Sequence, residues 1–193
     1  MTAVDEHRPD GRRVRGERNK EAVVSALLSL YDDGEIEPSV ARVAELAGVS
    51  ERSVFRYFLD TDDLAATAIK IQTERVQHFY EGLSTTGSFD ERLTAIVEHR
   101  LRLFDAVRGG MRASVVREHR SEVVHSASNF RRNFLRKQAV EQFRAEIAGR
   151  DTVARALEVA LSLETLAYLE SQHSRSTMRS TVETMVRAIL GQD

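Results

Sequence analysis

The spacing of prolines and glycines is the feature that most restricts the fold of this chain. No proline follows Pro38 in a sequence of 193 residues, and the later glycines separate long segments with apolar residues at helical spacing. No segment alternates polar and apolar residues with the period of two expected for a half-exposed strand. The sequence therefore predicts an all-α protein.

We expect a small N-terminal head on a larger helical body. The predicted helices are Asn19–Asp33, Val40–Ala47, Glu51–Phe58, Thr61–Leu83, Phe89–Val107, Met111–Arg120, Glu122–Ala148, Thr152–Gln172 and Thr177–Leu190. We divide the chain into a flexible basic arm (residues 1–18), a three-helix head (residues 19–65) and the body (residues 66–193).

Composition excludes several classes of protein. The chain has no cysteine, so disulfides, thiolate metal sites and cysteine nucleophiles are excluded. The N-terminal sequence lacks the apolar core of a secretory signal, and no apolar run approaches the ~20 residues that a membrane span needs. Hydrophobic residues make up 41% of the chain, enough for a packed core. We expect a folded cytoplasmic protein with no membrane partner.

Basic charge is concentrated near the N-terminus. The net charge of the whole chain is only -2, but six Lys and Arg residues lie between His7 and Lys20, against Asp10 and Glu17. Such an arm can follow a DNA groove, and a solvated arm with no DNA role is the alternative.

The stretch Ala44–Phe58, with the sequence AELAGVSERSVFRYF, has the pattern of a helix-turn-helix. A short amphipathic helix ends at Gly48, where glycine can adopt the left-handed backbone of a sharp turn. Ser50 then caps a second short helix, which in this motif enters the major groove of DNA. A helical corner that only builds core is the alternative.

The predicted outer face of the second helix has the chemistry of a DNA-reading surface. Arginine can form two hydrogen bonds with guanine, serine can reach a base edge or a phosphate, and an aromatic ring can contact a thymine methyl group. The residues expected on this face are Glu51, Arg52, Ser53, Phe55 and Arg56.

The segment from Asn19 to Ile69 resembles the N-terminal domain of TetR-family transcriptional regulators. The residues that carry this resemblance are Ser39, Val40, Val43, Ala44, Ala47, Gly48, Val49, Ser50, Val54, Phe55, Arg56, Tyr57, Phe58, Asp60, Asp63 and Leu64. The resemblance implies an all-helical dimer that binds double-stranded operator DNA. The DNA-binding residues that we expect are Arg12, Arg13, Arg15, Ser39, Ser50, Arg52, Ser53, Phe55, Arg56, Tyr57 and Thr61.

Two positions depart from the family pattern. Thr61 stands where a phosphate-binding lysine is common, and Ala41 stands where some members have a basic residue. Both differences remove cations from the DNA face. The arginines of the arm, at positions 12, 13, 15 and 18, are candidates to compensate.

The two C-terminal helices are candidates for a dimer interface. Residues 152–172 are apolar on two sides, so that helix needs burial on both, and residues 177–190 carry an apolar stripe. Pairing with a second copy would give a four-helix bundle, as the resemblance also implies. The expected interface residues are Val159, Leu163, Leu166, Met178, Val182, Met185, Val186 and Ile189, and a core within one chain is the alternative.

A small-molecule effector, which the resemblance implies, would bind in the body. Arg100 projects from the middle of an apolar helix face, and Glu164 lies on another such face, so each needs a partner. A structural ion pair is one interpretation, and an anchor for an acidic ligand is the other. The candidate ligand-binding residues are Arg100, Phe104, Phe130, Phe134, Glu164 and Tyr168.

We expect neither an enzyme nor a metal or cofactor site. The sequence has no phosphate-binding glycine loop and no nucleophile motif, and its histidines lack metal-ligand spacing. The leading hypothesis is a homodimeric repressor whose DNA affinity responds to a small ligand. A DNA-binding dimer without an effector is the alternative.

Overall fold

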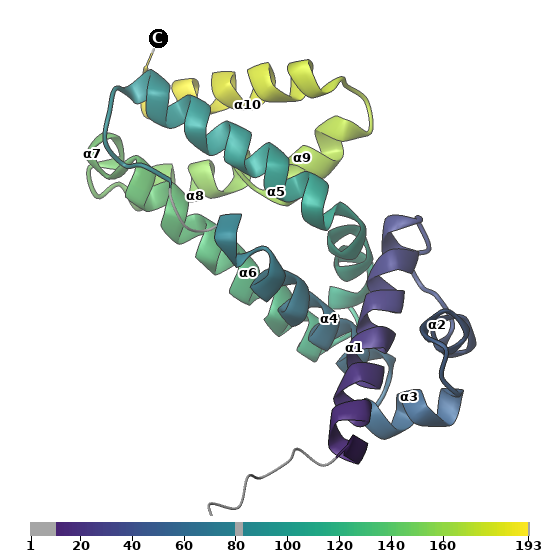
Figure 1. Cartoon of the computed structure of the whole chain (residues 1–193). Coiled ribbons are helices and arrows are strands. Elements are labelled where there is room, and N and C mark those ends of the chain that lie inside the picture. Colours follow the sequence, from purple (N-terminus) through teal and green to yellow (C-terminus); the bar gives the residue numbers. More distant parts are fainter. Residues whose placement is uncertain (1–10, 80–82, 193) are drawn as a thin grey trace, which may run out of the picture.

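The described part of the chain is helical throughout. The computed structural model describes residues 11–79 and 83–192, and within these ranges every regular element is a helix (Figure 1). The predicted all-α class is therefore confirmed. The helices are α1 (Gly11–Asp32), α2 (Val40–Ala47), α3 (Glu51–Tyr57), α4 (Thr61–Arg75), a short 3₁₀ helix η1 (Gln77–Phe79), α5 (Phe89–Glu118), α6 (Glu122–Gln142), α7 (Arg144–Ile147), α8 (Asp151–Ala160), α9 (Leu163–Glu170) and α10 (Arg175–Leu190).

Helices α1 to α3 form the head, and their hydrophobic core also includes Leu64 and Ala68 of α4. Apolar side chains of α1, such as Val23 and Leu27, pack with Val43 of α2, Val54 of α3 and Phe58. The remaining helices form the body, which extends away from α2 and α3 (Figure 1). The body has its own core, built from α5, α6, α8, α9 and α10.

The first helix is longer than predicted. It begins at Gly11 instead of Asn19, so residues 11–18 are helical and are not a flexible arm. Arginine, glutamate and lysine favour helix, and the isolated Gly16 lowers helix stability by only about 1 kcal/mol. The rest of the predicted arm, residues 1–10, lies outside the described residues.

Helix α5 runs without a break through the glycine pair that we expected to end it. Two predicted helices, Phe89–Val107 and Met111–Arg120, are in fact one helix from Phe89 to Glu118. Gly109 and Gly110 are both buried, because the α1 backbone at Tyr31 and Asp32 packs closely against Gly109 and the Gln72 side chain packs closely against Gly110. The pair therefore serves packing and does not form a turn.

Other long predicted helices are interrupted. The segment 122–148 breaks at Phe143, whose ring is fully buried and whose backbone leaves the helical conformation. The segment 152–172 breaks at Leu161, after which Ser162 accepts a hydrogen bond from the amide of Thr165 and caps α9. Helix α4 ends at Arg75, and residues 80–82 of its predicted range lie outside the described residues.

Helix α5 joins the body to the head. Ala113, near its C-terminal end, belongs to the core of the head, whereas Phe104 belongs to the core of the body. Arg117 of α5 forms an ion pair with Asp62 in the first turn of α4, with an N···O distance of 3.1 Å. The position of α4, which follows α3 directly, is therefore tied to α5.

Candidate nucleic-acid interface

The corner between α2 and α3 has the local geometry that the sequence predicts. The Ser39 hydroxyl accepts a hydrogen bond from the Arg42 amide, and α2 then ends at Gly48 with φ of 67°. The Ser50 hydroxyl accepts from the Ser53 amide and starts α3. Val54 is buried beneath α3, so the opposite face of this short helix is turned outward.

The outer face of α3 is exposed and basic at two positions. Arg52 and Arg56 are exposed, and Phe55 is 54% exposed although it is aromatic. Ser53 is half-buried, and its hydroxyl lies 3.0 Å from that of Ser50. Arginine beside an exposed aromatic ring suits contact with bases and the sugar-phosphate wall of a groove.

Tyr57 holds the guanidinium group of Arg56. Arg56 donates a hydrogen bond of 2.9 Å to the Tyr57 hydroxyl, and its guanidinium carbon lies 4.9 Å from the centre of the ring. This hydrogen bond is the main cause of a lowered pKa of Tyr57. The amide of Asn19 on α1 also lies 3.5 Å from the Tyr57 hydroxyl. Tyr57 therefore positions Arg56. Through its contact with Asn19, Tyr57 also links the end of α3 to α1, and the sequence did not reveal this role of Asn19.

The first turns of α1 bring further arginines toward the end of α3. Arg15 and Arg18 are exposed and lie three residues apart, on one side of the helix. The Lys20 ammonium group lies 5.7 Å from the centre of the Phe58 ring, which fixes this part of α1 beside the C-terminal end of α3 (Figure 1). Arg12 and Arg13 belong to the same helix, but their side chains lie outside the described residues.

Three predicted contact residues lie at the start of helices. Ser39 and Ser50 cap α2 and α3, and Thr61 is the exposed first residue of α4, whose cap is Asp60. Helix N-termini attract phosphate through their free amides and the helix dipole. Asp60 and Asp62 oppose this attraction at α4, so Thr61 is the weakest of the three candidates.

Only part of the predicted dimer interface lies on the surface. Of the predicted interface residues, Val159 is 62% exposed, and Met185 and Ile189 are partly exposed. The remaining predicted interface residues are buried in the core of the same chain, as the alternative interpretation held: Leu163, Leu166, Met178, Val182 and Val186. The interruption between α8 and α9 changes which faces of this segment turn inward, and helical spacing alone could not show that.

The six predicted ligand-binding residues do not form one site. Phe104 is buried in the body core, whereas Tyr168 lines an open groove of about 740 Å³ between α6 and α8 to α10. Phe130 and Phe134 line a second groove, between α4 and α6. A pair of Arg100 with Glu164 was one form of the structural ion pair that we considered, but Glu164 pairs with Arg132 on α6 at 3.0 Å.

Arg100 forms hydrogen bonds inside the body with groups on α6 and with its neighbour His99. It donates hydrogen bonds to the side-chain oxygen of Gln138 at 2.8 Å and to the carbonyl of Leu135 at 2.9 Å. Its guanidinium group also lies 3.0 Å from Nδ1 of His99. Arg100 is only 1% exposed, and its hydrogen bonds to Gln138 and Leu135 link α5 to α6.

His99 completes this buried cluster in its neutral form. Its Nε2 contacts the carbonyl of Phe79, to which it donates, and its Nδ1 then accepts from Arg100. Burial, with the Arg100 and Arg102 charges, lowers the pKa of His99 from 6.5 to about 3. The ring therefore stays uncharged in the folded chain through the mildly acidic range.

Acidification is expected to destabilise the body through His99. The unfolded imidazole binds a proton below about pH 6.5, whereas the folded one resists until about pH 3, so stability falls as pH drops through this window. The slope approaches ~1.4 kcal/mol per pH unit below the unfolded pKa, and the expected loss between pH ~6.5 and pH ~4.5 is about 2 kcal/mol.

Urea unfolding of the parent and of His99→Gln at about pH 7 and about pH 4.5 measures this loss. Glutamine keeps a donor for Phe79 and an acceptor for Arg100 but does not titrate, so the variant should lose about 2 kcal/mol less on acidification. The exposed His125, changed to glutamine, is the control. Equal losses in the parent and in His99→Gln would contradict the assignment.

In residues 11–79 and 83–192, no helix has the length and apolar character of a membrane span. Within the same ranges, no group of three or more His, Asp or Glu side chains is placed to hold a metal ion.

Several solved structures with a similar arrangement of helices are described as transcriptional regulators. Neither a family model nor a curated protein matches the sequence. A transcriptional regulator from Rhodococcus sp. Rha1 superposes with a TM-score of 0.71 at 17% identity, over 91% of this chain and 96% of that chain. A putative transcriptional regulator from Pseudomonas aeruginosa PAO1 gives 0.67 at 18% identity, over 97% and 95%.

The likeness in fold extends beyond the head to most of the chain. A putative TetR-family transcriptional regulator from Mesorhizobium loti MAFF303099 gives a TM-score of 0.66 at 14% identity, over 92% of this chain and 97% of that chain. The similarity includes the body, whose sequence carries no recognisable motif. The chain therefore has the fold of TetR-family transcriptional regulators.

Proposed function

We propose that this protein is a sequence-specific DNA-binding transcriptional regulator of the TetR family, and not an enzyme. The observation that carries the proposal is the outer face of α3, where Arg52, Phe55 and Arg56 are exposed on a helix held by the Gly48 corner and the Ser50 cap. The similar structures, all of regulators, support the same function. We propose that the protein acts in the cytoplasm as a homodimeric repressor that a small ligand releases from DNA.

Binding to genomic DNA tests this function directly. Fragments of the source genome are incubated with the protein at low salt, and retained fragments are sequenced and measured by fluorescence anisotropy. We expect a pseudo-palindromic site whose half-sites lie about 34 Å apart or more, because a symmetric dimer presents two recognition helices. Retention of no fragment, or equal affinity for every fragment, would contradict the proposal.

The exposed apolar residues of the C-terminal helices support a dimer. Val159, Tyr168 and Met185 line the groove of about 740 Å³ together with apolar side chains of α6. Val159 and Tyr168 are each more than half exposed, which is costly for large apolar groups in an isolated chain. We propose that the same surface of a second copy covers them.

A charge at the centre of this surface is expected to separate the dimer. Val159→Glu places a carboxylate against its own symmetry mate or against apolar side chains, and either contact costs several kcal/mol once water is excluded. Sedimentation equilibrium should show a dimer for the parent and a monomer for the variant. Val116→Glu, at an exposed site on α5, is the control. A variant that stays dimeric places the interface elsewhere.

A route from the body to the DNA face supports ligand control. Helix α4 follows α3 directly, and its first turn is paired with Arg117 of the body helix α5. A ligand that binds more tightly when α4 is in one orientation than in another favours that orientation and the head position that goes with it. The size of the shift is set by the difference between the ligand's affinities for the two states.

A further inference from the structure

We propose that the groove between α4 and α6 binds a neutral, mainly aromatic small molecule. The groove has a volume of about 560 Å³, within the range of roughly 300 to 1,000 Å³ that is usual for small-molecule sites. The groove would be the effector site of the ligand-responsive regulator, and this regulatory role rests on the proposed function. Binding of a small molecule to the groove can be measured without DNA, so the ligand site and the regulatory function can fail in separate experiments.

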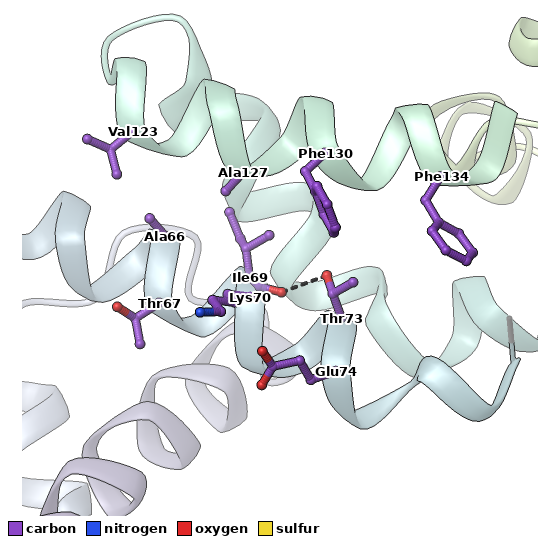
Figure 2. Close-up of a pocket in the computed structure, with 10 residues that line it drawn as sticks. All are labelled: Ala66, Thr67, Ile69, Lys70, Thr73, Glu74, Val123, Ala127, Phe130 and Phe134. Atoms are coloured by element: carbon purple, nitrogen blue, oxygen red, sulfur yellow. Dashed lines mark hydrogen bonds between the residues drawn. The ribbon is translucent and has the colours of Figure 1, made fainter. Parts of the chain in front are cut away.

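The α6 wall of the groove is apolar, and an aromatic pair dominates it. Phe130 and Phe134 lie one turn apart on α6, and Figure 2 shows both rings on the side that faces α4. Phe130 is 67% exposed and Phe134 is 37% exposed. Rings one turn apart offer faces and edges on which a planar ligand can stack. Each aromatic pair stabilises the complex by about 0.5 to 1.5 kcal/mol in addition to the free energy from buried apolar area.

The floor near the head is closed by small and branched side chains. Ala66 and Ile69 of α4 pack with Val124 and with Ala127 of α6, so the two helices touch at this end. Toward the body they separate, and the groove opens beside Thr73 and Phe134 (Figure 2). A ligand therefore lies along the helices, with its apolar end against Ile69 and Ala127.

The polar groups of the groove favour a ligand without net charge. Lys70 and Glu74, one turn apart on α4, contribute one charge of each sign to the lining, and their sum is zero. The Thr73 hydroxyl donates a hydrogen bond of 2.8 Å to the carbonyl of Ile69, so toward a ligand it can only accept. The expected ligand is a neutral aromatic molecule with a hydrogen-bond donor.

N-phenyl-1-naphthylamine is a probe with this chemistry. It is neutral, has two aromatic groups and one N–H donor, and its fluorescence increases when it leaves water. Titration of the full chain, without DNA, should show saturable binding. Phe130→Ala and Phe134→Ala should each weaken binding about tenfold, whereas Phe130→Trp, which keeps an aromatic surface, should bind as the parent does.

Val116→Ala is the matched control, since it truncates an exposed apolar side chain that does not line the groove. Circular dichroism and sedimentation confirm that each variant keeps its fold and its state of assembly. Absence of saturable binding by the parent, or unchanged binding by both alanine variants, would overturn the proposal. Loss of dimerisation in Phe130→Ala would overturn it too, because a second copy would then occupy the groove.

Discussion

Replacement of both exposed arginines of α3 by alanine is expected to weaken operator binding at least about 100-fold. Arg52 and Arg56 are exposed on the face of α3 opposite the buried Val54. Each base or phosphate contact made by an arginine contributes about 1 to 3 kcal/mol to the free energy of binding. Loss of two contacts of about 2 kcal/mol each lowers the affinity for the operator by more than a factor of about 100. Anisotropy titrations with the selected operator measure the change.

The single variants separate the roles of the two arginines. Arg56, which Tyr57 positions through the 2.9 Å hydrogen bond, is expected to contact phosphate, so Arg56→Ala should lower the salt slope by about one. Arg52→Ala should instead relax preference at one base pair. Tyr57→Phe removes the hydroxyl that holds Arg56 and should give a weaker form of the Arg56→Ala result.

A control variant excludes a general effect of charge. Arg155 on α8 is exposed and pairs with Asp151 in the body, so Arg155→Ala removes the same charge far from α3 in the chain. Its operator affinity should match that of the parent. If the double variant of α3 also binds as the parent does, α3 is not the reading helix.

The head could be predicted from the sequence because its signals are local. Ser39, Gly48 and Ser50 fix helix boundaries through bonds to neighbouring amides, and the observed bounds of α2 match the prediction. The outer face of α3 follows from which residues are apolar. No distant part of the chain is needed for either inference.

The body could not be predicted to the same depth, because its partners are distant in sequence. Arg100 was expected to need a partner, and two of the groups that accept its hydrogen bonds, Gln138 and the Leu135 carbonyl, lie more than thirty residues away in the sequence. Helical spacing shows that Leu163 and Val182 are apolar, but not whether their neighbour belongs to the same chain or to a second copy. The grooves depend on the angles between helices, which no local pattern contains.

The glycine pair in α5 was misread for the same reason, and it leads to a strong stability prediction. A Cβ added at Gly109 would lie 2.7 Å from the backbone nitrogen of Asp32 and 2.7 Å from the carbonyl carbon of Tyr31. Those atoms belong to α1, so the α1 backbone would have to move. A Cβ at Gly110 would instead meet the end of the Gln72 side chain, at 2.5 Å from its oxygen, and a side chain can rotate away.

Gly109→Ala is therefore expected to destabilise the protein by about 2 kcal/mol relative to Gly110→Ala. Both changes gain the same helix propensity, about 1 kcal/mol, so the comparison isolates the clash with α1, and overpacking typically costs about 1 to 3 kcal/mol. Melting temperatures in the same buffer should differ by about 4 to 8 °C, with Gly109→Ala the lower. Equal temperatures would mean that α1 can shift freely on α5. The crossing of these helices would then not hold the head in place, and the route from the body to α3 would depend on α4 and its pairing with Arg117.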